Sequence, residues 1–451
     1  MTSRQTCVPR TRGLAGGILL LLLTTSAAPA QTVPLPLTLT LGQATDSALK
    51  HNLQAVLSRE RRIEARGQAG ISLAELLPNL YASSSAADQT FNLAAMGFTS
   101  KVFPGIQPFL GPYTVFDARL RLTQTVFNLG AIWRYRAGRV GEALAADEER
   151  LAVQQVSTAT ALAYLRAAEA EQVVVSAKAD VQLAERLLDL AKNQREAGLA
   201  TGLDVTRAET RLAREQVRLA AAQTGQDTAR LDLLRLIGAP LGSEITLSEP
   251  MRFEPPLKAD TSAAVATALN ERADLHAAGE QLRIARAQRK AALAGYAPTV
   301  TFSGDYGASG VKPNEIDLPT RSVAIGLSFP VFDGGRTRSE VQVASSRERQ
   351  AEAQLEDLKA AIEKDVRQAI DELATRETQV RAAQKALALA ERELDLAQDR
   401  FKNGVADNIE VVNAQTALES AREAATASLA QFNIARLNVA AAMGRAQDFR
   451  L

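Results

Sequence analysis

The sequence contains almost no cysteine or histidine, and this scarcity limits the chemistry that the chain can perform. Cys7 is the only cysteine among 451 residues, and it lacks the small apolar residues that precede a lipid-attachment cysteine. We therefore expect no disulfide and no lipid anchor. The two histidines, His51 and His276, lie on predicted helices with no acidic cluster at metal-ligand spacing. Each is expected to have a structural or exposed role.

Motifs of known catalytic chemistry are also missing. The sequence has no Walker loop, no GxGxxG fingerprint and no GxSxG elbow. Beyond the N-terminal segment, the methionines are too scattered to form a soft-metal relay: Met96, Met251 and Met443. A formal net charge of +1 gives no reason to expect a nucleic-acid partner. We expect no catalytic residues, no metal and no cofactor, so energy for any driven process must come from a partner.

Long apolar segments are absent apart from one short run near the N-terminus. Arg4, Arg10 and Arg12 precede about ten apolar residues, Leu14–Leu23, and small residues follow as far as Ala30. This layout predicts a secretory signal peptide over residues 1–30, cleaved near Ala30. No later segment has the roughly twenty apolar residues that a membrane-spanning helix requires, so we expect no helical anchor.

What the sequence does contain is an internal duplication. Gly198-Leu199-Ala200 and Leu203-Asp204-Val205 recur as Gly404-Val405-Ala406 and Ile409-Glu410-Val411, at a constant offset of 206 residues. Such a repeat predicts two halves of one architecture. We place the halves at residues 31–238 and 261–444. A Pro-rich linker over 239–260 joins them, and a C-terminal tail covers 445–451.

Each half is expected to contain a helix, two strands, a very long helix, a turn and another helix. Neither glycine nor proline occurs in Arg336–Asn403, which is 68 residues long, or in Glu142–Ala197, which is 56 residues long. At 1.5 Å per residue, the longer segment predicts a helix of roughly 100 Å. A seven-residue repeat runs along it: Leu373, Val380, Leu387, Leu394 and Phe401. This repeat predicts coiled-coil packing, which by itself would also suit a dimeric coiled coil or a filament.

Alternating apolar and polar residues favour a different architecture. Val323, Ile325 and Leu327 alternate with small or polar residues, and Phe116–Leu122 shows the same pattern. Segments of about nine to twelve such residues suit tilted strands that cross a bilayer with one face in lipid, whereas a soluble sheet is the alternative. We predict β-hairpins at residues 80–127 and 298–332, with aromatic residues gathered near both as membrane-interface girdles.

Four strands in one chain cannot close a barrel. Open strand edges in lipid would leave backbone groups without hydrogen-bond partners, so the chain is expected to oligomerise. Three chains and twelve strands is the preferred solution, although the arithmetic also permits two or four chains.

Several motifs together resemble the TolC-like outer-membrane efflux family over nearly the whole predicted mature chain. They are Leu77-Pro78-Asn79-Leu80, the segment Ser328–Gly335, and the repeated turn sequences Gly198–Ala208 and Gly404–Ala414. The resemblance implies a mainly α fold with a small transmembrane β part. It implies a homotrimer whose twelve-stranded β-barrel, four strands per chain, continues into an α-helical coiled-coil barrel that crosses the periplasm.

The same resemblance implies a function and a set of partners. The chain is expected to be a passive outer-membrane exit channel of a tripartite efflux or type I secretion system. It would contact outer-membrane lipid, a periplasmic adaptor (membrane fusion) protein, and an inner-membrane pump or ABC exporter. A structural coiled-coil protein of the cell envelope without a pore is the alternative reading of the sequence.

By this resemblance, the two helix-to-helix turns, near residues 198–205 and 404–411, form a periplasmic tip that opens and closes. The resemblance assigns adaptor docking to eight residues: Gly198, Leu199, Leu203, Val205, Gly404, Val405, Ile409 and Val411. The gate residues are expected to be Asp204, Glu410, Phe401 and Asn413. Trimerisation would place six acids around the axis, although either acid would also favour the N-terminus of its own helix.

The predicted gate departs from the best-known pattern in the family. Phe401, Ala406 and Asn413 stand where that pattern has a tyrosine, an arginine and a second aspartate. The hydrogen bonds and ion pairs of that gate therefore cannot be carried over. We expect a closed tip here to depend more on apolar packing, including that of Phe401.

Overall fold

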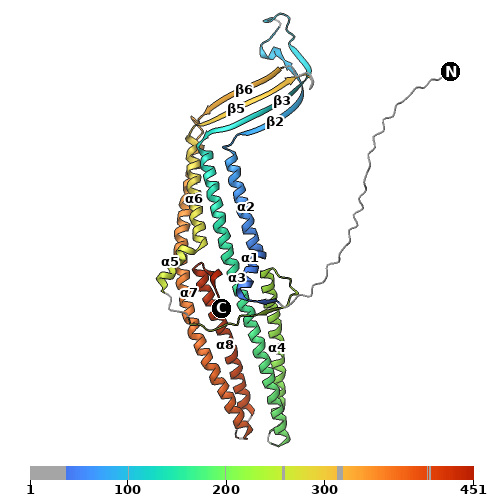
Figure 1. Ribbon diagram of the computed structural model, residues 1–451, viewed down its shortest axis with the longest axis vertical. Coiled ribbons are helices and arrows are strands. Elements are labelled where there is room, and N and C mark those ends of the chain that lie inside the picture. Colours follow the sequence, from blue (N-terminus) through green and yellow to red (C-terminus); the bar gives the residue numbers. More distant parts are fainter. Residues whose placement is uncertain are drawn as a thin grey trace, which may run out of the picture.

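The chain forms a long rod with a β-sheet at one end and two helical hairpins at the other (Figure 1). The computed structural model describes residues 37–99, 101–198, 200–255, 260–311, 318–403, 405 and 408–451. The predicted signal peptide lies outside these residues. Most of the described chain is helical, as the sequence predicts.

The sheet contains four antiparallel strands in the order β2-β3-β5-β6. Their bounds are β2 Asn79–Asn92, β3 Phe109–Asn128, β5 Thr299–Gly310 and β6 Leu318–Ser328. The strands β5 and β6 have 12 and 11 residues, within the predicted length, but β2 and β3 have 14 and 20. They are longer because their pairing resumes beyond an irregularity between Gln89 and Phe91 and continues to Asn92 opposite Phe109.

The strand register places apolar side chains on one face of the sheet and polar side chains on the other. Leu80 lies opposite Leu122, and Phe302 lies opposite both Gln124 and Ile325. Because side chains alternate along a strand, one face carries Leu80, Phe116, Leu120, Leu122, Val300, Phe302, Val323, Ile325 and Leu327. The opposite face carries Ser83, Asp117, Arg119, Arg121, Thr301, Ser303, Asp305 and Ser322. Apolar side chains on the first face are exposed, with Ile325 74% and Val323 71% accessible.

An arginine braces the polar face between the two hairpins. Arg119 on β3 lies 2.8 Å from Asp117 and 2.6 Å from Asp305 on the neighbouring strand β5. Gly307 is the partner of Arg119 in the register, and a Cβ added there would lie 2.3 Å from the Arg119 Cβ. The glycine therefore leaves the space that this arginine occupies.

The helices occupy the rest of the rod. Their bounds are α1 Leu41–His51, α2 Leu53–Ala74, α3 Leu129–Glu196, α4 Gly202–Ile237, α5 Thr261–Glu271, α6 Ala273–Leu293, α7 Arg336–Lys402 and α8 Asn408–Ala442. The helix α7 has 67 residues and matches the predicted long helix closely. No helix in the described part of the chain combines the length and apolar character needed to cross a membrane.

Two expectations about the helices were wrong in detail. The single helix predicted before each pair of strands is two helices, because Asn52 and Arg272 adopt extended backbone conformations. The Asn52 side chain accepts a hydrogen bond from the Gln54 amide and thereby caps α2. The helix α3 begins thirteen residues before Glu142 and includes Gly138, where a Cβ would lie 3.3 Å from the Ala69 Cα. Glycine is tolerated here because it permits close packing of α2 against α3.

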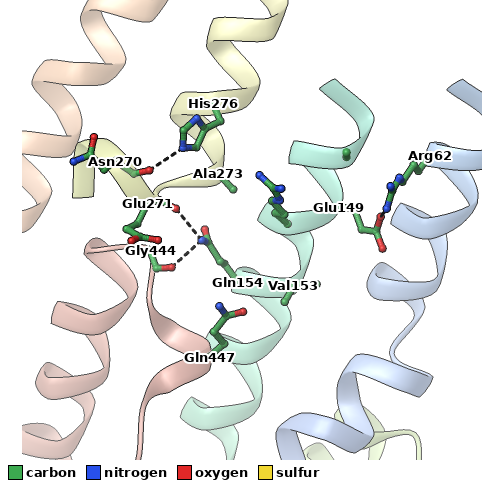
Figure 2. Close-up of a pocket in the computed structure, with 12 residues that line it drawn as sticks. Arg62, Glu149, Val153, Gln154, Asn270, Glu271, Ala273, His276, Gly444 and Gln447 are labelled. Atoms are coloured by element: carbon green, nitrogen blue, oxygen red, sulfur yellow. Dashed lines mark hydrogen bonds and ion pairs between the residues drawn. The ribbon is translucent and has the colours of Figure 1, made fainter. Parts of the chain in front are cut away.

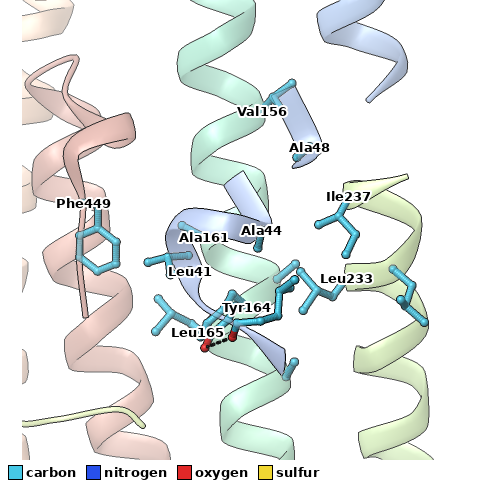
Figure 3. Close-up of a cluster of buried hydrophobic side chains, with 14 of the residues drawn as sticks. Leu41, Ala44, Ala48, Val156, Ala161, Tyr164, Leu165, Leu233, Ile237 and Phe449 are labelled. Carbon is cyan, nitrogen blue, oxygen red and sulfur yellow. Dashed lines mark hydrogen bonds between the residues drawn. The ribbon is translucent and has the colours of Figure 1, made fainter. Parts of the chain in front are cut away.

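The main hydrophobic core lies near the middle of the rod. A short parallel pair of strands, β1 Leu37–Leu39 and β4 Ile245–Leu247, runs beside it, and β4 lies inside the segment 239–260 that the sequence indicates as a linker. Figure 3 shows side chains from α1, α3 and α4 meeting around Tyr164, which is fully buried. The Tyr164 hydroxyl donates to the Leu39 carbonyl at 3.1 Å and accepts from the Glu249 amide at 3.3 Å.

The Tyr164 hydroxyl should contribute to stability. In the variant Tyr164→Phe, the Glu249 amide loses its acceptor inside the core, which should cost about 1–3 kcal/mol and lower the melting temperature. Circular dichroism during heating measures this change. The matched control is Tyr296→Phe, because the Tyr296 side chain is 57% exposed. Equal melting temperatures for the two variants would contradict the assigned role of this hydroxyl.

Candidate functional site at the hairpin turns

Two helical hairpins, α3–α4 and α7–α8, end close together at the pole opposite the sheet (Figure 1). The first turn uses Gly198 in a left-handed conformation with φ of +75°, which few other residues adopt without strain. The Ala200 amide donates to the Gln194 carbonyl at 3.2 Å and closes the end of α3. In the second turn the Val405 amide donates to the Arg400 carbonyl at 2.9 Å. Leu199, Gly404 and Ala406 lie outside the described residues.

Asp204 forms a capping box at the start of α4. Its carboxylate accepts hydrogen bonds from the Thr201 hydroxyl at 2.6 Å and the Thr201 amide at 2.9 Å. In return, the Thr201 hydroxyl accepts a bond from the Asp204 amide at 3.4 Å. The hydrogen bond from the Thr201 hydroxyl, followed by that from its amide, lowers the pKa of Asp204 below the ordinary aspartate value. This acid therefore supports a helix N-terminus, which is one of the two roles the sequence allows for it.

Glu410 occupies the first turn of α8 and has an arginine beside it. Its carboxylate lies 3.4 Å from the Arg400 guanidinium at the end of α7, and its side chain is 41% exposed. Asp204 is more enclosed, with a side chain 17% exposed and Arg207 at 3.8 Å. Each predicted gate acid thus has a cation nearby in the same chain. Glu410 presents more of its carboxylate at the surface than Asp204 does.

Phe401 lies inside the α7–α8 hairpin, where it is only 6% exposed. It belongs to a cluster with Leu394, Val411 and Leu418, and Leu183 from α3 joins the same cluster. The Phe401 carbonyl accepts a hydrogen bond from the buried Gln194 side chain at 3.2 Å. Phe401 therefore holds α7, α8 and the end of α3 together.

The predicted docking residues fall into two groups. Val205 and Val411 are buried within the hairpins, where they fix the first turns of α4 and α8. Leu203, Val405 and Ile409 are exposed by 58%, 69% and 44% at the turns, and Asn413 is exposed on α8. The second group presents an apolar surface at the end of the rod.

Sequence reasoning missed the partners of the predicted gate residues. The capping box could have been read from Thr201 and Asp204 at a spacing of three residues. Arg400 and Gln194 have no such signal, because their roles depend on contacts between segments that the turns bring together.

The histidines make no metal centre in the described part of the chain, where no group of three histidine, cysteine or acidic residues could hold a metal. The His276 Nε2 lies 2.8 Å from the Asn270 carbonyl oxygen, at the edge of a polar cavity of about 540 Å³. Figure 2 shows that Gln154 crosses this cavity and donates to the Gly444 carbonyl at 2.8 Å, which ties α3 to the C-terminal segment. His51 packs tightly against Gly238 at the end of α4.

Comparison with known proteins identifies one family along most of the chain. The family model described as outer membrane efflux protein matches residues 44–239 and 264–445. Its two matched segments cover both helical hairpins and all four strands of the described sheet.

Two relatives and one solved structure illustrate the similarity. The chain is 27% identical over 318 residues to the alkaline protease secretion protein AprF of Pseudomonas aeruginosa, covering 68% of this chain and 65% of AprF. It is 27% identical over 325 residues to the toluene efflux pump outer membrane protein TtgF of Pseudomonas putida, covering 69% of this chain and 66% of TtgF. The matches thus span just under two thirds of these relatives. The fold is similar to that of the Campylobacter jejuni CmeC outer membrane channel, with a TM-score of 0.80, 17% identity, and coverage of 90% of this chain and 86% of CmeC.

The capping box should stabilise the first turn of α4. Thr201→Ala removes one partner of the box and should cost about 1 kcal/mol of local helix stability. Amide hydrogen exchange at residues 202–206 should accelerate. The control Thr210→Ala alters a hydroxyl that bonds only to the Thr206 carbonyl inside the helix, so exchange there should not accelerate. Because the pKa of Asp204 is lowered by folding, its contribution is present above about pH 4 and is lost as the pH falls through the folded-state pKa. Equal exchange in both variants at pH 7 would refute the capping role.

Proposed function

The chain belongs to the outer membrane efflux protein family, and we propose that it is a passive exit channel for a tripartite efflux or type I secretion system. The observation that carries this proposal is the strand register, which gives the sheet one exposed apolar face and one polar face. A sheet of this kind suits a barrel wall with lipid outside and water inside. Members of this family are channel proteins and not enzymes.

The channel is proposed to be a homotrimer. Within the described sheet, β2 and β6 are the edge strands, each paired on one side only. Unpaired backbone groups in hydrocarbon cost several kcal/mol each, so β6 of one copy would pair with β2 of the next. Three copies would close a twelve-stranded barrel. The helix α2 supports this arrangement, because Leu53, Ile63 and Ile71 are each more than 60% exposed in the single chain and would be covered by a neighbour.

The rest of the rod is proposed to be the periplasmic tunnel, with the two halves of the chain acting as structural repeats. The hairpin turns would then lie at the inner end. Three copies of Asp204 and Glu410 would line the constriction, with Asn413 on the adjacent surface of α8. A ring of like charges attracts cations and repels anions. Arg207 and Arg400 would moderate that field, because each lies within 4 Å of one of these acids.

The exposed apolar residues at the turns suit a docking role. Leu203, Val405 and Ile409 would contact the tip of a periplasmic adaptor, and the adaptor would connect the channel to an inner-membrane pump or ABC exporter. The proposed docking set also includes Gly198, whose left-handed turn presents Leu203. AprF is named for protease secretion and TtgF for toluene efflux. We therefore assign the choice of cargo to the inner-membrane partner.

The proposed channel is tested directly by reconstitution. Protein extracted from outer membranes should have the native mass of a trimer and should conduct ions as single channels in a planar lipid bilayer. Closure of the barrel by three chains is the physical reason for both expectations. A monomeric mass, or a membrane without conductance after incorporation of the protein, would refute the proposal.

Phe401 gives a prediction about the closed tip. Phe401→Ala removes the side chain that packs α7, α8 and α3 together near the turns, so single-channel conductance should rise. The core truncation itself should cost about 3–5 kcal/mol. The matched control is Leu394→Ala, which is equally buried in the same cluster but lies two helical turns farther from the tip. If both variants conduct equally, the gate does not depend on Phe401.

A further inference from the structure

Two kinds of contact join the hairpins in the lower half of the rod. Close to the turns, Leu183, Leu187 and Leu190 of α3 pack against the apolar cluster of α7 and α8. Farther from the turns, a cavity of about 250 Å³ separates the hairpins. Its lining includes Ala177 on α3 and Ala222 on α4, with charged side chains opposite.

Charged side chains cross this gap at three heights. We call them the ionic seam: Asp180 on α3, Arg211, Glu215 and Arg218 on α4, and Glu419, Arg422 and Glu423 on α8. Arg422 lies 2.6 Å from Asp180, so one ion pair joins α8 to α3. Arg211 contacts Glu419, and Arg218 contacts both Glu419 and Glu423, so two arginines join α4 to α8.

The seam is enclosed at its centre. Glu215 is 1% exposed and accepts from Arg211 at 2.8 Å and from Arg218 at 3.0 Å, so it holds both arginines toward α8. Asp180 is 5% exposed as a residue, and the side chains of Arg211 and Glu419 are each 13% exposed. Removing one member would leave its partner charged and poorly hydrated.

The spacing of these residues shows that they replace an apolar contact. Arg211, Glu215 and Arg218 recur at intervals of four and three residues and therefore share one face of α4. Glu419, Arg422 and Glu423 share one face of α8 in the same way. Within the α7–α8 hairpin, the corresponding positions near the turns are filled by leucine, alanine and phenylalanine.

We propose that the ionic seam is a releasable clasp that sets how far the two hairpins, and hence the tip, can separate. An apolar interface that opens exposes hydrocarbon to water, whereas opened ion pairs are rehydrated. The apolar core of each hairpin would then keep it rigid while the seam permits movement between hairpins. This inference rests on the proposed function, because it concerns the opening of that channel.

The test is a charge reversal across the seam in the full-length protein. Asp180→Arg alone and Arg422→Asp alone should each accelerate amide exchange severalfold in the first turns of α4 and α8 and raise single-channel conductance. The double variant restores opposite charges and should return both measurements toward wild type. The matched control is Arg367→Gln, which breaks an ion pair with Glu363 inside α7 only and should change neither.

Exchange around Tyr164 separates a local effect from general unfolding. Acceleration confined to the hairpin ends supports the clasp, whereas equal acceleration in the Tyr164 core would overturn it. Glu423→Gln covers the event that a reversal prevents folding, because Glu423 is 65% exposed at the rim and its loss should accelerate exchange in the same place. Single reversals that behave like Arg367→Gln, or a double variant without recovery, would also overturn the clasp. Absent wild-type conductance would refute the channel, while hydrogen exchange would still decide the clasp.

Discussion

Close packing along helix α3 is the constraint on which the rest of the structure depends. A single helix of 68 residues has little stability in water unless its neighbours bury part of its surface along its length. Alanine is the commonest buried residue of α3, and small side chains let neighbouring helices approach closely. Near the sheet α3 packs against α2 and α6, in the middle against α1, and toward the turns against α4 and α8. The sheet and the hairpin turns are therefore both positioned by one helix.

The lower half of the rod combines rigid and separable contacts. The apolar cluster around Phe401 and Val411 holds α7 to α8, and the smaller cluster around Leu188 and Val205 holds α3 to α4. Between the hairpins the ionic seam takes over a few turns above the tip. A change in tip diameter by movement of whole hairpins would thus leave most apolar contacts intact and would alter mainly charged ones.

The acids at the turns show how one side chain can combine a structural and an electrostatic role. Asp204 caps α4, and the same hydrogen bonds that form the cap lower its pKa and keep it ionised at neutral pH. Its field would therefore persist wherever a tunnel passes it. Glu410 is more exposed and has Arg400 as its neighbour, so its contribution depends on how far that pair is separated.

The sequence by itself determined the kinds of element and the faces they bury, because helix and strand periodicity and capping signals are local. The glycine-free segment from Arg336 predicted α7 to within one residue, the alternation around Ile325 predicted the two-faced sheet, and Thr201 with Asp204 carried a readable cap. Only the tertiary structure decided where Phe401 lies, that Gly138 is tolerated inside α3, and which charges meet across the seam. Arg211 and Glu419 are about two hundred residues apart in the chain. Their contact follows from the relative placement of two hairpins, and no local pattern in either segment specifies it.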